Sequence, residues 1–342
     1  MRKLLNTLYI TNELCYLSKD RENIVITIDD KEVKRFPIHI LEGVICFNYN
    51  GISPGVIRLC NENHISIAIL TPYGKFCGRF IGKTNGNVYL RREQYRIADD
   101  EEKSLKVSKN FIIGKLNNSR KILMRLIRDH KEKINSEKVQ KTVDNLMEQI
   151  KKIQTVNNKD SLRGIEGESA RNYFSNFSEM ILSQKEHFIF NERNKRPPKD
   201  RVNALLSFLY SLLTYEVQSA LESVGLDSYV GFFHTDRPGR AGMALDMMEE
   251  LRAYMVDRLA ITLINRKQID SRGFEEKENE SVLLNEKGRN IVIEAWQKKK
   301  QEEIMHPYIE EKISIGLLPY VQAQLLVRYI RGDINEYPPF LL

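Results

Sequence analysis

The spacing of apolar residues changes near Ala98, and this change divides the chain into two parts. Before it, apolar and polar side chains alternate in short runs such as the one containing Ile24, Ile26 and Ile28, which is typical of β-strands. After it, apolar residues recur every three or four positions, which is typical of helices that pack against a core. We therefore predict an α+β protein, with a small β-rich N-terminal domain at 1–97 and a larger all-α C-terminal domain at 98–342.

Turn and capping residues place several elements of the β-rich part. Asp29-Asp30-Lys31 predicts a turn after the isoleucine-containing strand, and Asn85-Gly86-Asn87 predicts a hairpin-type turn. Ser53 favours a helix over Pro54–Glu62, because serine is a good N-cap and proline fits the first helical position. Further strand-like runs are Gly43–Asn48, Ile65–Thr71, Lys75–Gly82 and Val88–Arg96.

The C-terminal part contains one helix that is apolar on nearly every side. Arg201–Val224 has this pattern, which predicts a helix buried in the centre of a bundle. The acidic residues of Asp99–Glu102 favour a helix start. Residues 135–160 predict a helix followed by a loop from Thr155, and residues 270–280 predict a loop without regular structure.

Composition indicates what kind of partner the protein binds and in which compartment we expect it. The chain has 342 residues and a net charge of +7, an excess that favours a polyanionic partner such as DNA, RNA or a membrane surface. No apolar run reaches the roughly 20 residues that span a bilayer. The first thirteen residues predict a strand and not a signal peptide. The four cysteines lack the paired spacing of a zinc site, so we expect reduced core thiols in a cytoplasmic protein.

A basic run extends over Lys103–Arg128, which contains eight basic residues and no acidic one. On a helix, one side carries leucines and an isoleucine, while the opposite side carries Lys103, Lys106, Lys121, Arg125 and Arg128. Such a run is often only a solvated face, but the missing acid also favours contact with DNA. Gly114 lies within the run, so a single straight helix is not guaranteed.

Glu166 is an unusual carboxylate. If a helix begins near Gly164, Glu166 lies on the same side as Ala170 and Tyr173, whereas Glu168 points to the polar side. A carboxylate on an apolar face is costly unless it is paired or binds a metal. The pattern leaves open a buried pair with an arginine, a hydrated helix start or a functional site.

A second candidate site lies in residues 231–252. His234 precedes a glycine-containing loop, and in the following helix Asp246, Glu249 and Glu250 share one side. Carboxylates in this pattern usually form a solvated face, and the spacing does not choose between Glu249 and Glu250. If they bind an ion, oxygen ligands with one imidazole suit Mg²⁺ or Mn²⁺.

The loop between His234 and this helix is basic. Arg237 and Arg240 lie close to the carboxylates in sequence and are suited to contact phosphate oxygens.

Five segments together resemble the CRISPR-associated integrases, the "Cas-one" proteins that insert new spacers into CRISPR arrays. The similar segments are GKLNNSRKILMR (114–125), RGIEGESARNYF (163–174), RVNALLSFLYSLL (201–213), GFFHTDRPGRAGMALDMMEELR (231–252) and RGDINEYPPF (331–340). The resemblance implies a β-rich N-terminal domain and a helical C-terminal domain. It also implies that Glu166, His234 and Glu249 are the catalytic metal ligands, with Asp246 as a support or alternative ligand.

The same resemblance implies partners and a reaction. The protein would dimerise through its β-rich domain, two dimers would flank a dimer of the smaller Cas-two protein, and the complex would hold an incoming spacer duplex. Its 3′-hydroxyl ends would attack phosphodiesters at the CRISPR repeat by metal-assisted transesterification, and water in place of the hydroxyl would give endonuclease activity. Two alternatives remain, namely a non-catalytic DNA-binding scaffold and a branched-DNA repair nuclease.

Overall fold

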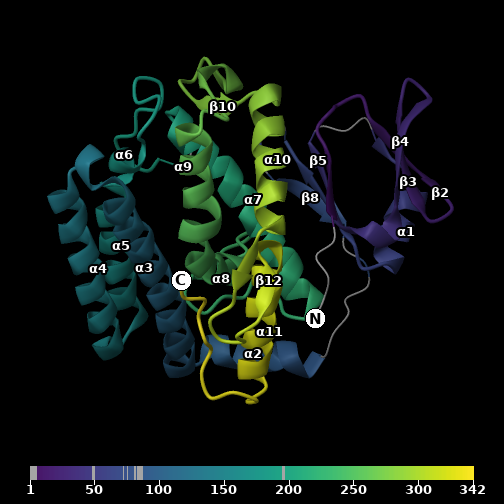
Figure 1. Ribbon diagram of the computed structural model, residues 1–342. Coiled ribbons are helices and arrows are strands. Elements are labelled where there is room, and N and C mark those ends of the chain that lie inside the picture. Colours follow the sequence, from purple (N-terminus) through teal and green to yellow (C-terminus); the bar gives the residue numbers. More distant parts are fainter. Residues whose placement is uncertain are drawn as a thin grey trace.

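A computed structural model describes residues 6–47, 51–71, 73–74, 76–80, 82, 88–194 and 197–342. Strands dominate up to residue 80 and helices from residue 88 onward. In Figure 1 the two sheets lie at one end of the molecule, beside the helices. The α+β class with a β-rich N-terminal part is therefore confirmed.

The strands of the N-terminal part form two four-stranded sheets. One sheet has the order β1-β5-β7-β8 and the other β4-β3-β2-β6. The first contains β1 (Asn6–Ile10), β5 (Leu41–Phe47), β7 (Ser66–Leu70) and β8 (Phe76–Phe80), of which only β8 is antiparallel to its neighbour. The second contains β4 (Lys31–Pro37), β3 (Asn23–Ile28), β2 (Tyr16–Asp20) and β6 (Gly51–Ile52).

Most of the predicted N-terminal elements are present. The turn between β3 and β4 has positive φ at Asp29 (50°) and Asp30 (59°), a conformation that aspartate tolerates better than most residues. Helix α1 spans Pro54–Glu62 as predicted, and the Ser53 hydroxyl accepts a hydrogen bond from the Val56 amide at 3.3 Å.

The strand predicted at Val88–Arg96 is wrong. This segment belongs to helix α2 (Val88–Asp99), in which Leu90, Gln94 and Ile97 are buried. These residues are four and three positions apart, so they lie on one helical face despite the strand-favouring valine and tyrosines nearby. The turn predicted at 85–87 lies outside the described residues.

Helices make up most of the C-terminal part. They are α3 (Glu101–His130), α4 (Ser136–Thr155), α5 (Lys159–Phe174), α6 (Phe177–Met180), α7 (Arg201–Ser223), α8 (Gly242–Leu251), α9 (Arg258–Asn265), α10 (Glu286–Gln301) and α11 (Leu318–Ile330). A π-helical segment, Arg252–Asp257, joins α8 to α9. Short 3₁₀ helices span Ile38–Ile40, Lys131–Lys133, Ser271–Gly273 and Ile315–Leu317.

Two predictions about the C-terminal part need correction. It is not purely helical, because β9 (Phe274–Glu276) pairs with β10 (Val282–Leu284) and β11 (Glu303–Met305) pairs with β12 (Lys312–Ser314). The first of these hairpins falls where we predicted an irregular loop at 270–280. The sequence did not indicate this hairpin because the segment is rich in charged residues and because each strand pairs over only three residues.

Helix α7 lies at the centre of the core, as its apolar sequence predicts. Fourteen of its residues are buried, and it packs against α8, α11 and the π-helical segment. The β1-β5-β7-β8 sheet joins the same core through Ile45, Phe47 and Ala68. No helix in the described ranges is both long and apolar enough to cross a membrane.

Candidate active site

The basic run forms part of α3, which continues through Gly114 without a break. As predicted, one side is exposed (Lys103, Lys106, Lys121, Arg125, Arg128) and the other is buried (Leu105, Ile112, Leu116, Leu123, Leu126).

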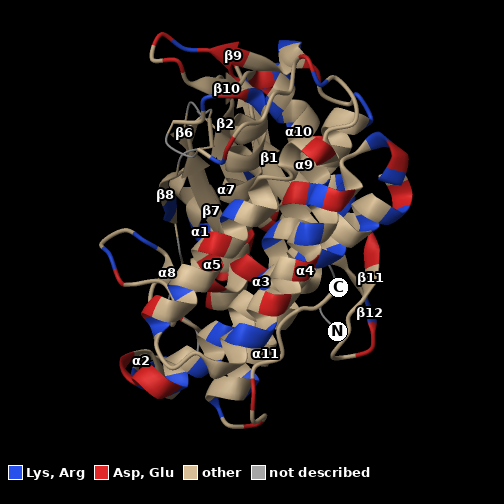
Figure 2. Ribbon diagram, turned by 90° about the vertical axis from the view of Figure 1, so that its left-hand side faces the viewer, with Lys and Arg blue, Asp and Glu red and all other residues tan. Residues whose placement is uncertain are grey.

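Residues outside the run supply the acid that it lacks. Asp129 pairs with both arginines of the exposed side, and Asp100 and Glu336 pair with Lys103 and Lys106. In Figure 2, basic (blue) and acidic (red) segments are interspersed along the helices that face the viewer. Because exposed pairs of this kind contribute little to stability, these side chains remain available to a polyanion.

Gly114 allows α3 and α8 to approach closely. A Cβ atom at this position would lie 2.8 Å from the Cβ of Glu250, a distance that real side chains do not tolerate. The close approach places the next residue of α3, Lys115, beside Glu249 on α8. Gly114, the residue for which the sequence did not guarantee a straight helix, therefore allows the contact between Lys115 and Glu249.

Glu166 lies on α5, which starts five residues earlier than predicted. The helix begins at Lys159, where the Asn158 side chain accepts a hydrogen bond from the Ser161 amide at 2.8 Å. Glu166 is 23% exposed and forms an ion pair with Lys115. Of the alternatives from the sequence, the arrangement is closest to a partly buried ion pair, although the partner is a lysine and not an arginine.

The three carboxylates of α8 are buried, so the expectation of a solvated face is wrong. Glu250 points into the core, where it accepts hydrogen bonds from the Tyr337 hydroxyl at 2.5 Å, Gln322 at 2.9 Å and the Phe340 amide at 2.9 Å. Burial raises its pKa to about 7. These contacts attach residues 337–340 to α8, which is a structural role.

Asp246 holds the segment that carries His234. Its Oδ2 accepts hydrogen bonds from the amides of Phe232 (2.6 Å) and Phe233 (2.8 Å), and its Oδ1 accepts one from the His234 amide (2.9 Å). The same Oδ1 lies 2.5 Å from His234 Nδ1. The contact with Asp246 therefore fixes the ring through Nδ1 and leaves Nε2 as the ring nitrogen that can bind another group.

Glycine permits this arrangement as well. A Cβ at Gly231 would lie 2.7 Å from Asp246 Oδ2, so a larger residue would push the carboxylate away from the amides that it binds.

Glu249 lies among positive charges. Its Oε1 is 2.8 Å from an Arg252 guanidinium nitrogen, and its Oε2 is 2.8 Å from Lys115 Nζ. Burial alone would raise the pKa of Glu249, but Arg252 and Lys115, together with His234, lower it to about 2. Glu249 is therefore ionised throughout the physiological pH range, unlike the adjacent Glu250.

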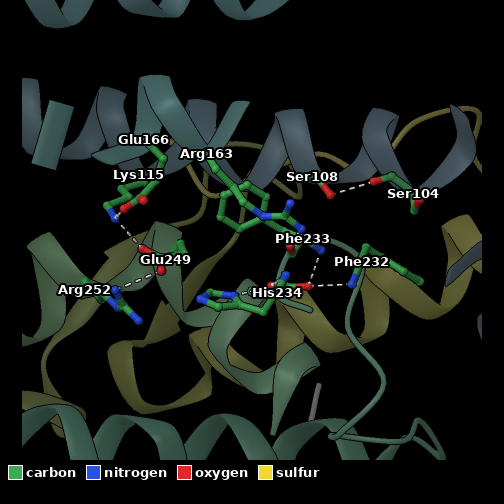
Figure 3. Close-up of polar contacts among 11 residues, drawn as sticks. Ser104, Ser108, Lys115, Arg163, Glu166, Phe232, Phe233, His234, Glu249 and Arg252 are labelled. Atoms are coloured by element: carbon green, nitrogen blue, oxygen red, sulfur yellow. Dashed lines mark hydrogen bonds and ion pairs between the residues drawn. The ribbon is translucent and has the colours of Figure 1, made fainter. Parts of the chain in front are cut away.

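The structure thus gathers the three predicted residues in one place from three segments, as Figure 3 shows. Lys115 joins Glu166 to Glu249, and the ring of His234 turns to the side where Glu249 and Arg252 lie. The carboxylates converge on an ammonium group. Within the described ranges, no three His, Cys, Asp or Glu side chains are arranged as a ready metal site.

The chemistry of these groups nevertheless fits a divalent cation. Glu249 Oε2 is buried and has no hydrogen-bond partner among the described residues, since its contact with Lys115 has the distance but not the geometry of a hydrogen bond. His234 offers Nε2, while Asp246 fixes its ring. Two carboxylates and one imidazole are a suitable ligand set for Mg²⁺ or Mn²⁺. Asp246 is occupied with backbone amides, so it fits the support role better than the ligand role.

The two loop arginines lie on the exposed segment between His234 and α8. Arg237 is exposed and Arg240 partly so, and the Arg240 amide donates a hydrogen bond to the Arg237 carbonyl at 3.0 Å. Neither arginine contacts Glu166 or Glu249 through an ion pair in the described structure. Contact with DNA by these residues stays a prediction.

Sequence reasoning missed the cations beside the carboxylates. Lys115 follows buried Phe111 and Ile112 on α3 by four and three residues, so it lies on their side of the helix. A lysine on an apolar face needs a partner, which is the signal that could have identified it. Arg252 follows Glu249 by three residues, the spacing of a helical ion pair.

A polar cluster behind the site was also missed. Asp257 is buried and accepts hydrogen bonds from the hydroxyls of Tyr210 (2.5 Å) and Tyr173 (3.1 Å). The guanidinium groups of Arg193 and Arg252 both lie over the Tyr210 ring. These residues and Lys115 line a cavity of about 40 Å³. Nothing in the sequence spacing brings these residues together.

Comparison with known proteins decides the family. The sequence model of a family described as "CRISPR associated protein Cas1" matches residues 8–298. The chain belongs to the Cas1 family. A protein of Chlorobaculum tepidum named CRISPR-associated endonuclease Cas1 1 is 46% identical over 341 residues, covering 100% of this chain and 99% of the relative. A Cas1 endonuclease of Rhodospirillum rubrum is 44% identical, with 99% of each chain covered.

Solved structures share the fold of this Cas1 chain. A Cas1 protein from Thermotoga maritima has a TM-score of 0.82 at 22% identity and covers 96% of this chain and 97% of its own. A casposase bound to integration product has a TM-score of 0.84 at 22% identity, with 98% and 93% covered. A chain of a Cas6-RT-Cas1–Cas2 complex has a TM-score of 0.83 at 23% identity, and this chain covers 36% of it.

Proposed function

We propose that this Cas1 protein is a metal-dependent DNA endonuclease and integrase that joins short DNA duplexes to a CRISPR array. One observation carries the proposal: Glu166 and Glu249, from different helices, converge on one cation beside His234. The name endonuclease, which the full-length relatives bear, supports the nuclease part. The casposase bound to integration product has the same fold, which supports the integrase part by analogy.

Glu166, Glu249 and Nε2 of His234 would hold Mg²⁺ or Mn²⁺. When bound, such an ion polarises a phosphodiester and stabilises the charge that develops on the phosphorus in transesterification or hydrolysis. Two contacts set the orientation and the charge of these ligands before a metal binds. Asp246 fixes the ring of His234, and Arg252 helps to keep Glu249 ionised.

DNA would lie along the basic side of α3 and the loop before α8. Arg237, Arg240 and the exposed basic residues of α3 would neutralise backbone phosphates. Binding is then expected to weaken steeply as salt increases, because neutralised phosphates release counterions.

The expected assembly also belongs to this proposal. Residues 1–97 would form the dimerisation domain and residues 98–342 the catalytic domain, although this boundary falls inside α2. A Cas2 dimer would lie between two Cas1 dimers in the cytoplasm. A chain of the Cas6-RT-Cas1–Cas2 complex shares the fold, and the Cas2 named in that complex supports such a partner.

Half-site integration into a supercoiled plasmid with a CRISPR array tests the proposal. We expect Glu166→Ala, His234→Ala and Glu249→Ala each to abolish joining in Mg²⁺ or Mn²⁺ while remaining folded. Glu168→Ala is the matched control, because Glu168 lies two residues from Glu166 on the exposed side of the same helix. Running each reaction with and without the small partner shows whether joining needs it.

Two results would support the alternatives. Salt-sensitive DNA binding without chelator-sensitive strand transfer would indicate a non-catalytic scaffold. Faster turnover on generic branched DNA than on repeat-containing DNA would indicate a repair nuclease.

A further inference from the structure

Lys115 is a cation buried between two carboxylates. Its side chain is 12% exposed and extends from α3 to Glu166 on α5 and Glu249 on α8, so it links three helices. Figure 3 shows the ammonium group lying between the two acidic side chains. Burying a lysine is costly unless opposite charges accompany it, and here two do.

The two carboxylates depend on this cation to different degrees. Among the described residues, Glu166 has no hydrogen bond or ion pair other than the one with Lys115. Glu249 has Arg252 on its Oε1, so Lys115 occupies only its Oε2 side. The ammonium group therefore lies between Oε1 of Glu166 and Oε2 of Glu249, and Arg252 contacts the other oxygen of Glu249.

We propose that Lys115 is a positioning residue that acts as the resident counter-ion of the metal site and competes with the divalent cation for the space between Glu166 and Glu249. This inference rests on the proposed function. An ammonium group and a metal ion cannot occupy the same place between the two oxygens. Metal binding therefore displaces the lysine, and the affinity for metal is lowered by the interactions that the lysine gives up.

The charges of the site give this competition a consequence. Glu166 and Glu249 are balanced by Lys115 and Arg252 before any metal binds. A divalent ion adds two positive charges, and a bound phosphodiester, which carries one negative charge, offsets part of them. The displaced ammonium would meet the same phosphate. Metal and DNA are then expected to bind more tightly together than either does alone, because each relieves the charge of the other.

Titration of the full-length protein with Mn²⁺, followed by calorimetry in the absence of DNA, tests the role of Lys115. We expect Lys115→Met to bind Mn²⁺ about tenfold more tightly than the wild type, because the competing charge is gone. In chelator the same variant is expected to melt at a lower temperature, and Mn²⁺ is expected to raise that temperature more than in the wild type. A simple packing defect would weaken metal binding instead.

Three controls accompany the measurement. Lys141→Met removes an exposed lysine from α4, which carries none of the proposed ligands, and should leave Mn²⁺ affinity unchanged. Lys115→Arg keeps a cation and should bind Mn²⁺ no more tightly than the wild type. Glu249→Gln should abolish binding, which assigns the signal to this site. If Lys115→Met unfolds in chelator, Mn²⁺ should restore its fold.

The outcomes separate this inference from the proposed function. Equal or weaker Mn²⁺ binding by Lys115→Met, with binding to the wild type abolished by Glu249→Gln, would overturn the role of Lys115 and leave the metal site in place. A Lys115→Met protein that stays unfolded in Mn²⁺ would overturn it too. Absence of Mn²⁺ binding in the wild type and in Lys115→Met would overturn the metal site and the role of Lys115 together.

Discussion

At the scale of single residues, two adjacent glutamates on α8 have opposite surroundings. Glu249 faces Lys115 and Arg252, which help to lower its pKa to about 2. Glu250 faces Tyr337 and Gln322, and burial raises its pKa to about 7. Of these two adjacent glutamates, only Glu249 carries a negative charge toward the site at every physiological pH.

This difference predicts separate effects of Glu249→Gln and Glu250→Gln. Strand joining should fall by more than about 100-fold in Glu249→Gln, because an essential charge is lost from the site. Glu250→Gln should keep joining within about tenfold but lower the free energy of unfolding by about 1–3 kcal/mol, because one of the two oxygens that accept hydrogen bonds from Tyr337, Gln322 and Phe340 becomes an NH₂ donor. Joining assays and urea unfolding measure the two effects. Equal loss of joining in both variants would contradict the assignment.

Asp257 predicts a pH-dependent contribution to stability. Burial raises its pKa from 3.8 to about 6, although the hydroxyls of Tyr210 and Tyr173 act in the opposite direction. The folded protein therefore keeps a proton on Asp257 that the unfolded chain has already released between pH 4 and pH 6. The contribution of Asp257 to stability is complete below about pH 4 and is lost as the pH rises through about 6.

The variant Asp257→Asn isolates this effect, because asparagine has a similar shape and does not titrate. The free energy of unfolding of the wild type minus that of Asp257→Asn should fall by on the order of 2–3 kcal/mol between pH 4 and pH 7. Urea unfolding at a series of pH values measures it. A constant difference over this range would show that the pKa of Asp257 is not raised.

Residue roles were predictable only in part from the sequence. Helical position marked Glu166 as unusual and placed Glu249 and Glu250 on one side, but spacing could not distinguish the two. Tertiary contacts make the distinction: Lys115 of α3 contacts Glu249, and Tyr337 contacts Glu250. Both contacts join segments that are far apart in the chain. Lys115 was not predicted as a site residue because it is one of eight basic residues in the run Lys103–Arg128.

At the scale of elements, local signals predicted what local interactions determine. The Ser53 cap set the start of α1, and continuous apolarity set the burial of α7. Helix α2 was mistaken for a strand because its helical face includes the polar Gln94. That side chain donates to the carbonyls of Asp227 (2.8 Å) and Val230 (2.9 Å), and this tertiary contact could not be read from the sequence.

The crossing of α3 and α8 predicts the effect of Gly114→Ala. The new Cβ would lie 2.8 Å from the Cβ of Glu250, so the helices must separate. We expect a loss of about 1–3 kcal/mol in the free energy of unfolding, typical of overpacking, and a loss of strand joining as Lys115 and Glu249 move apart. Urea unfolding and the joining assay measure both effects.

Gly164→Ala is the matched control for this prediction. A Cβ at Gly164 meets no heavy atom of the described structure within 4 Å, and alanine favours a helix by about 1 kcal/mol over glycine. Gly164→Ala should therefore be as stable as the wild type or more stable. Similar behaviour of the two variants would mean that helix propensity, and not the crossing, decides the outcome at Gly114.

At the scale of the whole molecule, one buried lysine joins the sheet region to the helices. Lys300 on α10 is 1% exposed, and its Nζ lies 3.0 Å from Glu42 of β5 and 2.6 Å from Glu216 of α7. It also donates a hydrogen bond to the Thr7 hydroxyl of β1 at 3.1 Å. The β1-β5-β7-β8 sheet is therefore fixed to the helical core by charge as well as by apolar packing.

This connection predicts that Lys300→Met weakens the whole fold, because it removes the buried cation that the partly buried carboxylates of Glu42 and Glu216 both contact. The free energy of unfolding should fall by about 3–5 kcal/mol, the usual effect of removing one partner from a buried ion pair. Lys298→Met removes an exposed lysine from the same helix and should change it by less than about 1 kcal/mol. If the Lys300 cluster joins the two regions into one cooperative unit, fluorescence and circular dichroism should report one urea transition in the wild type and separate transitions in Lys300→Met. A single, unshifted transition in Lys300→Met would show that the Lys300 cluster is not needed to hold the regions together.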